Sequence, residues 1–222
     1  MPASDKTSPR LIVSDADMKA GIKALRRNCE FARLMHDAAG DPPLRRREPG
    51  LEGLARIIVA QQLSVASANA IWGRFEQTVK PLTPRGLLAA SESDLRSAGL
   101  SRPKIRALTA VARELVDTGL DLGDLNGLTD MEVHEALTRI SGVGPWTADI
   151  FLMFCLGRAD AFAAGDLALQ VAAQMAMDLD ERPSAKELLD IAERWRPWRG
   201  VAARLLWAYY KVAKAPNSGV PV

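Results

Sequence analysis

Two features between residues 137 and 166 could do chemistry: a Gly142-Val143-Gly144 turn and the aspartate at position 166. Two glycines one residue apart allow the backbone to turn sharply and leave it bare of side chains. Backbone N–H groups at such a turn, backed by the N-terminus of a following helix, bind anions, and phosphate is the natural one. Asp166 begins an apolar-rich stretch, so it would hold a carboxylate at the start of a helix. The pattern predicts a phosphate site followed by a fixed carboxylate.

Each feature also has a purely structural interpretation. Gly-x-Gly alone is an ordinary turn between two helices, and aspartate is among the best N-cap residues. The structural and chemical roles of Asp166 are compatible, because the helix that a carboxylate caps also holds that carboxylate in place. Asp160 is a nearby alternative, but it precedes the loop and fits the pattern poorly.

Helices must position these features, and the sequence predicts helix throughout. Leu137 and Ile140 keep a helical apolar spacing before the turn, and Trp146 and Ile150 keep one after it. Pro145 takes the first position of the second helix, where a missing N–H costs nothing. No long alternating pattern typical of strands is present, so the expected class is all-α. The other expected helix starts are at Ser14, Ser64, Thr83, Ser101, Thr129 and Ser184, and a last helix should run from Pro197 toward Lys211.

The 222-residue chain has the composition of a globular protein, with 48% hydrophobic and 25% charged residues and a net charge of +2. So small a charge argues only weakly for nucleic acid. Basic residues gather at 45–47, 102–106 and 194–204, although each group could also be a solvated face. The N-terminus lacks an apolar secretory segment, and no run of about eighteen apolar residues could span a membrane. We expect a cytoplasmic protein with no membrane partner.

Cys29 and Cys155 lie far apart on apolar helical patterns, which favours buried free thiols in a reducing compartment. Two cysteines cannot supply the four ligands of an iron–sulfur cluster. His36 and His134 are the only histidines, and neither has the spacing of a metal ligand. The sequence therefore predicts no iron–sulfur cluster and no required cofactor.

The segment LTRISGVGPWTAD at 137–149, with Asp166 beyond it, resembles the signature of the helix-hairpin-helix DNA glycosylases. That family's pattern is Leu-x-x-(Ile/Leu/Phe)-(Pro/Ser)-Gly-(Val/Ile)-Gly-x-(Lys/Trp)-Thr-Ala-(Asn/Asp), followed later by a catalytic Asp. Three further segments resemble the alkylation-repair branch, the 3-methyladenine type: IIVAQQLS at 57–64, GLSRPKI at 99–105 and WRPWR at 195–199. The resemblance thus covers nearly the whole chain.

The resemblance implies an all-α fold of two lobes, the helix-hairpin-helix DNA glycosylase fold, with the active site in the cleft between the lobes. A central lobe of residues 48–160 would hold the hairpin. A second, discontinuous lobe would join residues 1–47 to 161–222. The N-terminal β-domain of some relatives would be absent, because the residues before the Gln-Gln loop are predicted to be helical.

By resemblance, Asp166 would be the catalytic residue, stabilising oxocarbenium-like charge on the deoxyribose and helping a water add to C1′. Most glycoside hydrolases need a second carboxyl to protonate the leaving oxygen. A purine alkylated at N3 or N7 is already cationic and leaves without a proton, so one carboxylate is enough. Trp146 stands where strand-cutting relatives place a lysine that forms a Schiff base.

The resemblance also implies a base pocket lined by Trp146, Trp207 and Ile150. An electron-poor, cationic base gains from stacking on an aromatic face. The alternative for each tryptophan is simple packing: Trp146 as a core residue at a helix start, and Trp207 as part of a helix that is buried on two faces.

Two segments are expected to contact DNA. In the loop, Gln62 or Leu63 would fill the gap left by an extruded base, at a cost in unstacking energy, unless the loop is a plain helix–helix turn. In the hairpin, backbone N–H groups would hold a phosphate. The expected DNA contacts are Gln61, Gln62, Leu63 and Ser64 in the loop, and Gly142, Val143, Gly144 and Thr147 in the hairpin.

The family's hairpin also binds an alkali-metal ion through backbone carbonyls. The corresponding positions are Thr138, Ile140 and Val143, which would hold Na⁺ or K⁺ in a structural role. Carbonyl groups carry no sequence signal, so this expectation depends on the resemblance alone.

The sequence thus favours a monomeric, monofunctional DNA glycosylase of base excision repair that acts on double-stranded DNA containing damaged bases. It would flip out an alkylated purine and hydrolyse its N-glycosidic bond, leaving an abasic site. Two alternatives stay open. One is a glycosylase for another lesion, such as uracil or a deaminated purine; the other is a non-catalytic binder of damaged or abasic DNA, in which Asp166 is only a cap.

Overall fold

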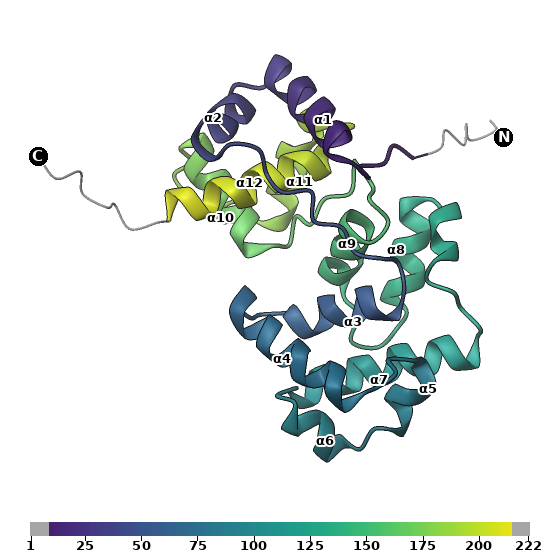
Figure 1. The fold of residues 1–222 in the computed structure, drawn as a ribbon. Helices are drawn as coiled ribbons and strands as arrows, with labels where there is room; N and C mark the ends of the chain where they lie inside the picture. Colours follow the sequence, from purple (N-terminus) through teal and green to yellow (C-terminus); the bar gives the residue numbers. More distant parts are fainter. Residues whose placement is uncertain (1–8, 215–222) are drawn as a thin grey trace, which may run out of the picture. The chain divides into compact units, whose positions relative to one another are not determined.

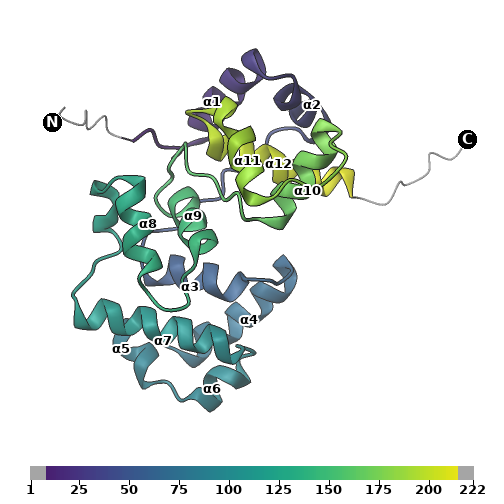
Figure 2. The ribbon, with the colours of Figure 1, turned by 180° about the vertical axis from the view of Figure 1, so that it is seen from behind.

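The computed structural model describes residues 9–214, which fold into helices joined by short loops. Within this range there is no β-sheet, and the only β-type pairing is an isolated antiparallel bridge between Leu11 and Arg158. The all-α prediction is therefore confirmed. The described chain forms two compact units, one of residues 46–156 and one of residues 9–45 with 157–214 (Figures 1 and 2).

The unit of residues 46–156 is built around α3 (Leu51–Ala60). This helix packs against α4, α7 and α9, and both views show it between α9 and α7. Its residues from 57 to 59 are at most 1% exposed, whereas Glu52 and Arg56 form a polar face on which they pair with each other. The other elements of the unit are α4 (Val65–Thr78), α5 (Pro84–Ala89), α6 (Glu92–Ser97), α7 (Arg102–Asp117), the 3₁₀ turn η1 (Asp124–Gly127), α8 (Asp130–Thr138) and α9 (Pro145–Phe154).

The other unit is organised around α12 (Arg199–Ala213), which packs against α1, α2 and α10. Residues 200–206 of α12 are all buried, so the first half of this helix is the core of the unit. The remaining elements are α1 (Asp15–Asn28), α2 (Glu30–Ala39), α10 (Leu167–Met177), α11 (Ala185–Ala192) and the 3₁₀ turn η2 (Glu193–Trp195).

The predicted helix starts are confirmed at the caps. All six expected positions are N-caps, and the side chains of five of them accept a hydrogen bond from a backbone N–H in the first turn, which satisfies a donor that has no partner inside the helix. The Ser101 side chain, at the start of α7, makes no such bond. Three of them, at the starts of α1, α8 and α11, form complete capping boxes with an acidic residue three positions on. The capping residues are Ser14, Ser64, Thr83, Thr129 and Ser184.

The predicted start of the last helix was wrong by two residues. The helix begins at Arg199, because Trp198 has a non-helical backbone (φ −120, ψ 27). The carboxylate of Asp160 fixes this start: it accepts from Arg199 Nη2 at 3.0 Å and also pairs with Arg196. Arg204 is 3% exposed and donates to the Gly200 carbonyl. The basic cluster at 194–204 therefore includes arginines that hold the fold rather than a free basic face.

Both cysteines are free and buried, as predicted. Burial raises the pKa of the Cys155 thiol to about 12, so this thiol stays protonated and unreactive at neutral pH. Among residues 9–214, no helix combines the length and apolar character needed to cross a membrane.

Candidate active site and DNA-binding surfaces

Asp166 is the N-cap of α10, and its carboxylate has several hydrogen-bond donors. The Oδ1 atom accepts from the N–H groups of Ala168 at 3.0 Å and Leu169 at 3.1 Å. The same oxygen accepts from the indole Nε1 of Trp207 at 3.1 Å. Asp166 and Trp207 are both partly exposed, so the fixed carboxylate stays accessible to a reactant. The structure thus combines the capping role of Asp166 with a geometry suited to chemistry.

The loop that leads to Asp166 is held from the protein interior. The amide of Gln170, which is 9% exposed, donates to the Ala164 carbonyl at 3.0 Å. The N–H of Asp166 donates to the Ala163 carbonyl at 2.9 Å. Gln170 lies one turn into α10, so the helix fixes both Asp166 and the loop before it. Sequence reasoning missed Gln170, although a polar residue in the apolar pattern of 167–177 was a signal.

The other carboxylate considered from the sequence, Asp160, pairs with arginines near the start of α12. It takes part in ion pairs with Arg196 and Arg199 and accepts from the Arg199 backbone N–H. Its role is to join the 157–166 loop to the start of α12. Asp166 is therefore the better placed of the two for a chemical role.

The hairpin lies between α8 and α9, and its two glycines differ in what surrounds them. Gly142 has φ +87, and a β-carbon there would lie 2.5 Å from the β-carbon of Ala107 on α7. Gly144, the N-cap of α9, has open space where a β-carbon would be. Gly142 is thus required by the backbone and by packing against α7, whereas Gly144 leaves the outer side of the turn clear.

The amide N–H groups of the hairpin are not all available to a ligand. The Val143 N–H donates to the Ile140 carbonyl at 3.0 Å, so this group is engaged within the turn. Among the described residues, the N–H groups of Gly142 and Gly144 form no hydrogen bond. These two groups are the donors that the turn can offer to an anion.

Helix α9 carries the remaining hairpin residues. Trp146 is partly exposed at its second position, and Ile150, one turn on, is 6% exposed. Thr147 is 1% exposed, so its side chain lies in the interior. His134 Nε2 on α8 lies 3.6 Å from Asp149 Oδ1, which links the two helices of the hairpin.

The loop between α3 and α4 exposes both polar and apolar side chains. Gln62 has a left-handed backbone (φ +56) and is exposed, and Leu63 is 38% exposed. Ser64 caps α4, as predicted. Val65, which follows it, is 66% exposed and was missed by sequence reasoning because valine is usually buried. The apolar tip of this loop is therefore Leu63 with Val65.

Gln61 joins the loop to the hairpin. Its side-chain Nε2 donates to the Thr147 hydroxyl at 2.9 Å, across a separation of 86 residues. This bond ties the loop to the first turn of α9 and gives the buried Thr147 hydroxyl a partner. The predicted DNA contact of Gln61 stays a prediction.

Helix α7 contacts the end of α3, just before the α3–α4 loop. The Lys104 ammonium donates to the Val59 carbonyl at 2.7 Å, in the last turn of α3. Burial lowers the pKa of Lys104. A lysine at a helix C-terminus satisfies a carbonyl that has no partner in the helix. Since Ala107 on the same helix contacts Gly142, α7 supports both the loop and the hairpin.

The carbonyls of the expected alkali-ion site have suitable chemistry. Within residues 9–214, the Thr138 and Val143 carbonyls accept no backbone hydrogen bond outside the helices, and the Ile140 carbonyl accepts one, which leaves a second lone pair. Neutral carbonyl oxygens are ligands that hard cations such as Na⁺ and K⁺ prefer. The three residues therefore fit such an ion.

Comparison with known proteins agrees with this geometry. Residues 55–197 match the family of HhH-GPD superfamily base excision DNA repair proteins. DNA-3-methyladenine glycosylase 1 of Schizosaccharomyces pombe is 31% identical over 175 residues, which cover 77% of this chain and 76% of that protein. Coverage differs among the relatives: the chain spans 56% of the length of the Bacillus subtilis protein YfjP.

Solved structures give the same result. The 3-methyladenine DNA glycosylase Mag1 of S. pombe, in complex with abasic DNA, matches with a TM-score of 0.79 and 28% identity, covering 85% of this chain and 95% of that one. A DNA-3-methyladenine glycosidase from Bacillus halodurans matches with a TM-score of 0.72 and 33% identity, covering 90% and 92%. Because the family match covers more than half of the residues and the hairpin has the expected geometry, this chain belongs to the HhH-GPD superfamily of base excision DNA repair proteins.

Proposed function

We propose that the chain is a monofunctional DNA glycosylase that flips alkylated purines of the 3-methyladenine type out of duplex DNA. It hydrolyses their N-glycosidic bond and leaves an abasic site. The observation that carries the proposal is Asp166, an accessible carboxylate fixed by the start of α10 and by Trp207. Relatives named as 3-methyladenine glycosylases, one of them solved with abasic DNA, support this substrate class.

In the proposed reaction, Asp166 stabilises the positive charge that develops on the deoxyribose as the base departs. A donor or charge aimed at a developing charge contributes about 3–4 kcal/mol. The leaving base carries its own positive charge, so no second carboxylate is needed to protonate it. Water then adds to C1′. Trp146 stands where a lysine would attack the sugar, so strand cleavage through a Schiff base has no nucleophile at this position.

The hairpin and the loop supply binding rather than chemistry in this proposal. The N–H groups of Gly142 and Gly144 hold a phosphate, and the tip formed by Leu63 and Val65 enters the gap left by the flipped base. The residues proposed to contact the flipped base are Trp146 and Ile150 on α9 of one unit and Trp207 on α12 of the other. The enzyme acts as a monomer inside the cell and needs no cofactor, with an alkali ion on the hairpin carbonyls in a structural role only.

The test is a single-turnover base-release assay on duplexes that carry 3-methyladenine, 7-methylguanine, uracil or hypoxanthine. Release of the alkylated purines supports the proposal, and release of uracil or hypoxanthine alone would replace it with another lesion class. Asp166→Asn should keep affinity for the duplex and slow release on the order of a hundred- to a thousandfold. Binding without release by the native protein would indicate a non-catalytic binder of damaged DNA.

A second readout checks the single function. Incubation with lesion duplex and borohydride should yield no covalent protein–DNA adduct, and the strand should stay intact until alkali is added. A trapped adduct would show that another amine replaces the missing lysine.

A further inference from the structure

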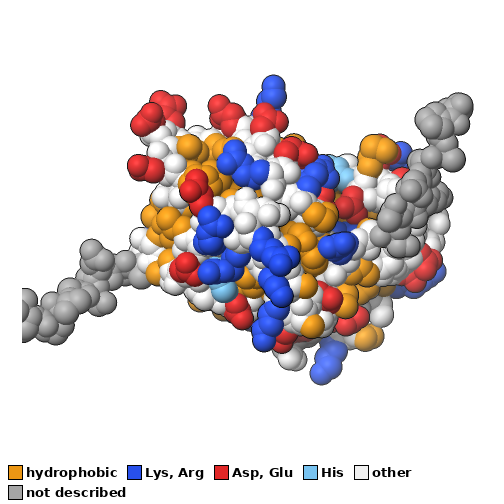
Figure 3. Space-filling view, turned by 90° about the horizontal axis from the view of Figure 1, so that it is seen from above, with side chains coloured by type: hydrophobic (Ala, Val, Ile, Leu, Met, Phe, Trp, Pro, Cys, Tyr) orange, Lys and Arg blue, Asp and Glu red, His pale blue; other side chains and the backbone are white. Residues whose placement is uncertain are grey.

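A basic groove lies between α1 and α2, apart from the residues proposed for base release. It has a volume of about 520 Å³. Five cations and a histidine line it, against one carboxylate, whereas the whole chain carries a net charge of only +2. Figure 3 shows such a gathering of Lys and Arg side chains, with a His beside it, on the face seen from above. The lining residues are Lys19, Ile22, Lys23, Arg26, Arg27, Arg33, His36 and Asp41.

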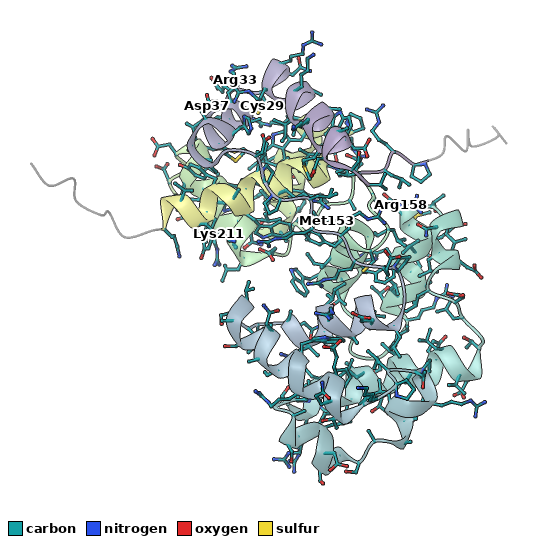
Figure 4. The ribbon with its side chains drawn as sticks, in the orientation of Figure 1. Cys29, Arg33, Asp37, Met153, Arg158 and Lys211 are labelled. Atoms are coloured by element: carbon teal, nitrogen blue, oxygen red, sulfur yellow. The ribbon has the colours of Figure 1, made fainter. Side chains whose placement is uncertain are left out.

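One end of the groove is ordered by its own polar contacts. Arg26 pairs with Asp37, and its Nη1 lies 2.8 Å from His36 Nδ1. His36 Nε2 lies 2.7 Å from Asp41. Arg33 Nη1 donates to the Arg26 carbonyl at 2.8 Å, which joins the two helices. Figure 4 labels Arg33 and Asp37 on α2, near the junction with α1.

The other cations have no such partner. Within residues 9–214, Lys19, Lys23 and Arg27 form neither an ion pair nor a side-chain hydrogen bond, and all three are exposed. They follow one another at intervals of four residues, so they lie along the same side of α1. At a rise of about 1.5 Å per residue, the row is about 12 Å long.

This row matches a polyanion with closely spaced charges. One strand of a DNA duplex presents a phosphate about every 3.4 Å along the axis, so a row of this length meets about three of them. A peptide with acidic residues would also need apolar contacts to be held. The groove offers almost none, because its apolar lining residue, Ile22, is 4% exposed.

We propose that the groove between α1 and α2 is a second DNA-binding site, which holds the phosphates of duplex DNA independently of any lesion. The inference rests on the proposed function only in taking DNA as the polyanion. Contacts of this kind add affinity and carry no base information. The site would therefore strengthen binding to all duplex DNA and leave the rate of base release unchanged.

The test compares two triple variants that remove the same charge. The row variant removes the three charges of α1 by the substitutions Lys19→Gln, Lys23→Gln and Arg27→Gln. The control variant removes three exposed charges near α11, in the same unit, by the substitutions Arg182→Gln, Lys186→Gln and Arg194→Gln. Binding to a long undamaged duplex is titrated by fluorescence anisotropy between ~50 mM and ~200 mM salt. Thermal unfolding checks that each variant is folded.

We expect the row variant to bind more weakly than the native protein and the control. Its slope of log affinity against log salt should be shallower by up to about 2.7, or about 0.9 for each of three lost phosphate contacts. Single-turnover base release at saturating enzyme should be unchanged. If the row variant has the same affinity for the duplex and the same salt slope as the native protein, the proposal is overturned. That result is also the one expected if the groove binds an acidic protein segment and not DNA.

The titration on undamaged DNA does not depend on base release. A native protein that releases no base from the lesion panel would therefore refute the proposed function and leave this site standing. A native protein that releases bases, with a row variant that binds like the control, would refute this site alone.

Discussion

At the scale of single residues, the bond between Trp207 and Asp166 changes the role that the sequence assigned to the tryptophan. Trp207 was expected to line the base pocket, and the structure shows that its Nε1 donates to the Asp166 carboxylate at 3.1 Å. Together with the two backbone donors of α10, the indole fixes the Oδ1 atom. One side chain can thus both contact the base and orient the carboxylate.

The substitution Trp207→Phe separates these two roles. It keeps an aromatic ring and removes the N–H donor. A hydrogen bond to a charged group is worth about 1.5–3 kcal/mol, so base release should slow on the order of ten- to a hundredfold while affinity for lesion duplex changes little. The measurements are single-turnover release and an anisotropy titration, with Trp207→Ala as the variant that loses both roles. Release at the native rate by Trp207→Phe would show that only the ring matters.

At the scale of the helix-hairpin-helix element, the two glycines have separable roles. The sequence predicted that both serve DNA binding. The structure places Gly142 against Ala107 with a positive φ, and Gly144 against open space. The backbone conformation and a neighbouring helix therefore require Gly142 whether or not DNA is bound.

The matched pair Gly142→Ala and Gly144→Ala tests this difference. Gly142→Ala should lower the unfolding free energy by roughly 1–3 kcal/mol, because the β-carbon meets Ala107 and φ stays positive. Gly144→Ala should unfold close to the native temperature and bind lesion and undamaged duplexes more weakly by similar factors. Thermal unfolding and anisotropy titrations on both duplexes measure these effects. Loss of lesion discrimination alone in Gly144→Ala would place the hairpin in the base pocket instead.

At the scale of the whole molecule, the product of the proposed reaction should stabilise the fold. A ligand that binds only the native state adds about 2.7 kcal/mol to the unfolding free energy at a concentration a hundredfold above its Kd. Abasic duplex should therefore raise Tm more than an undamaged duplex of the same length and concentration. Differential scanning calorimetry at several DNA concentrations measures the shift. Equal shifts from both duplexes would mean that the protein does not distinguish an abasic site.

The elements of the molecule could be predicted from the sequence because their signals are local. A capping serine or threonine, the proline of α9 and the apolar periodicity each act within a few residues, and the predicted caps are confirmed. The last helix was misplaced because its start depends on Asp160, which lies 39 residues away. No local pattern carries that contact.

The details of the candidate site escaped prediction for the same reason. Gln61 and Thr147, Lys104 and Val59, and Asp166 and Trp207 are bonded across separations of 86, 45 and 41 residues. The basic groove escaped for a second reason: four of its cations lie on α1, whereas Arg33 and His36 lie on α2, so only the pairing of the two helices brings them together. The net charge summed over the sequence does not show where charges cluster on the folded surface.

Helix α7 has a consequence for how this protein can change. The same stretch supports the loop between α3 and α4 through Lys104 and the Gly142–Gly144 turn through Ala107, the two segments proposed to bind DNA. A shift of α7 would therefore move the α3–α4 loop and the Gly142–Gly144 turn together, so the distance between these two segments depends on this one helix. Substitutions at the two ends of this support should be strongly non-additive, because they share one rigid part.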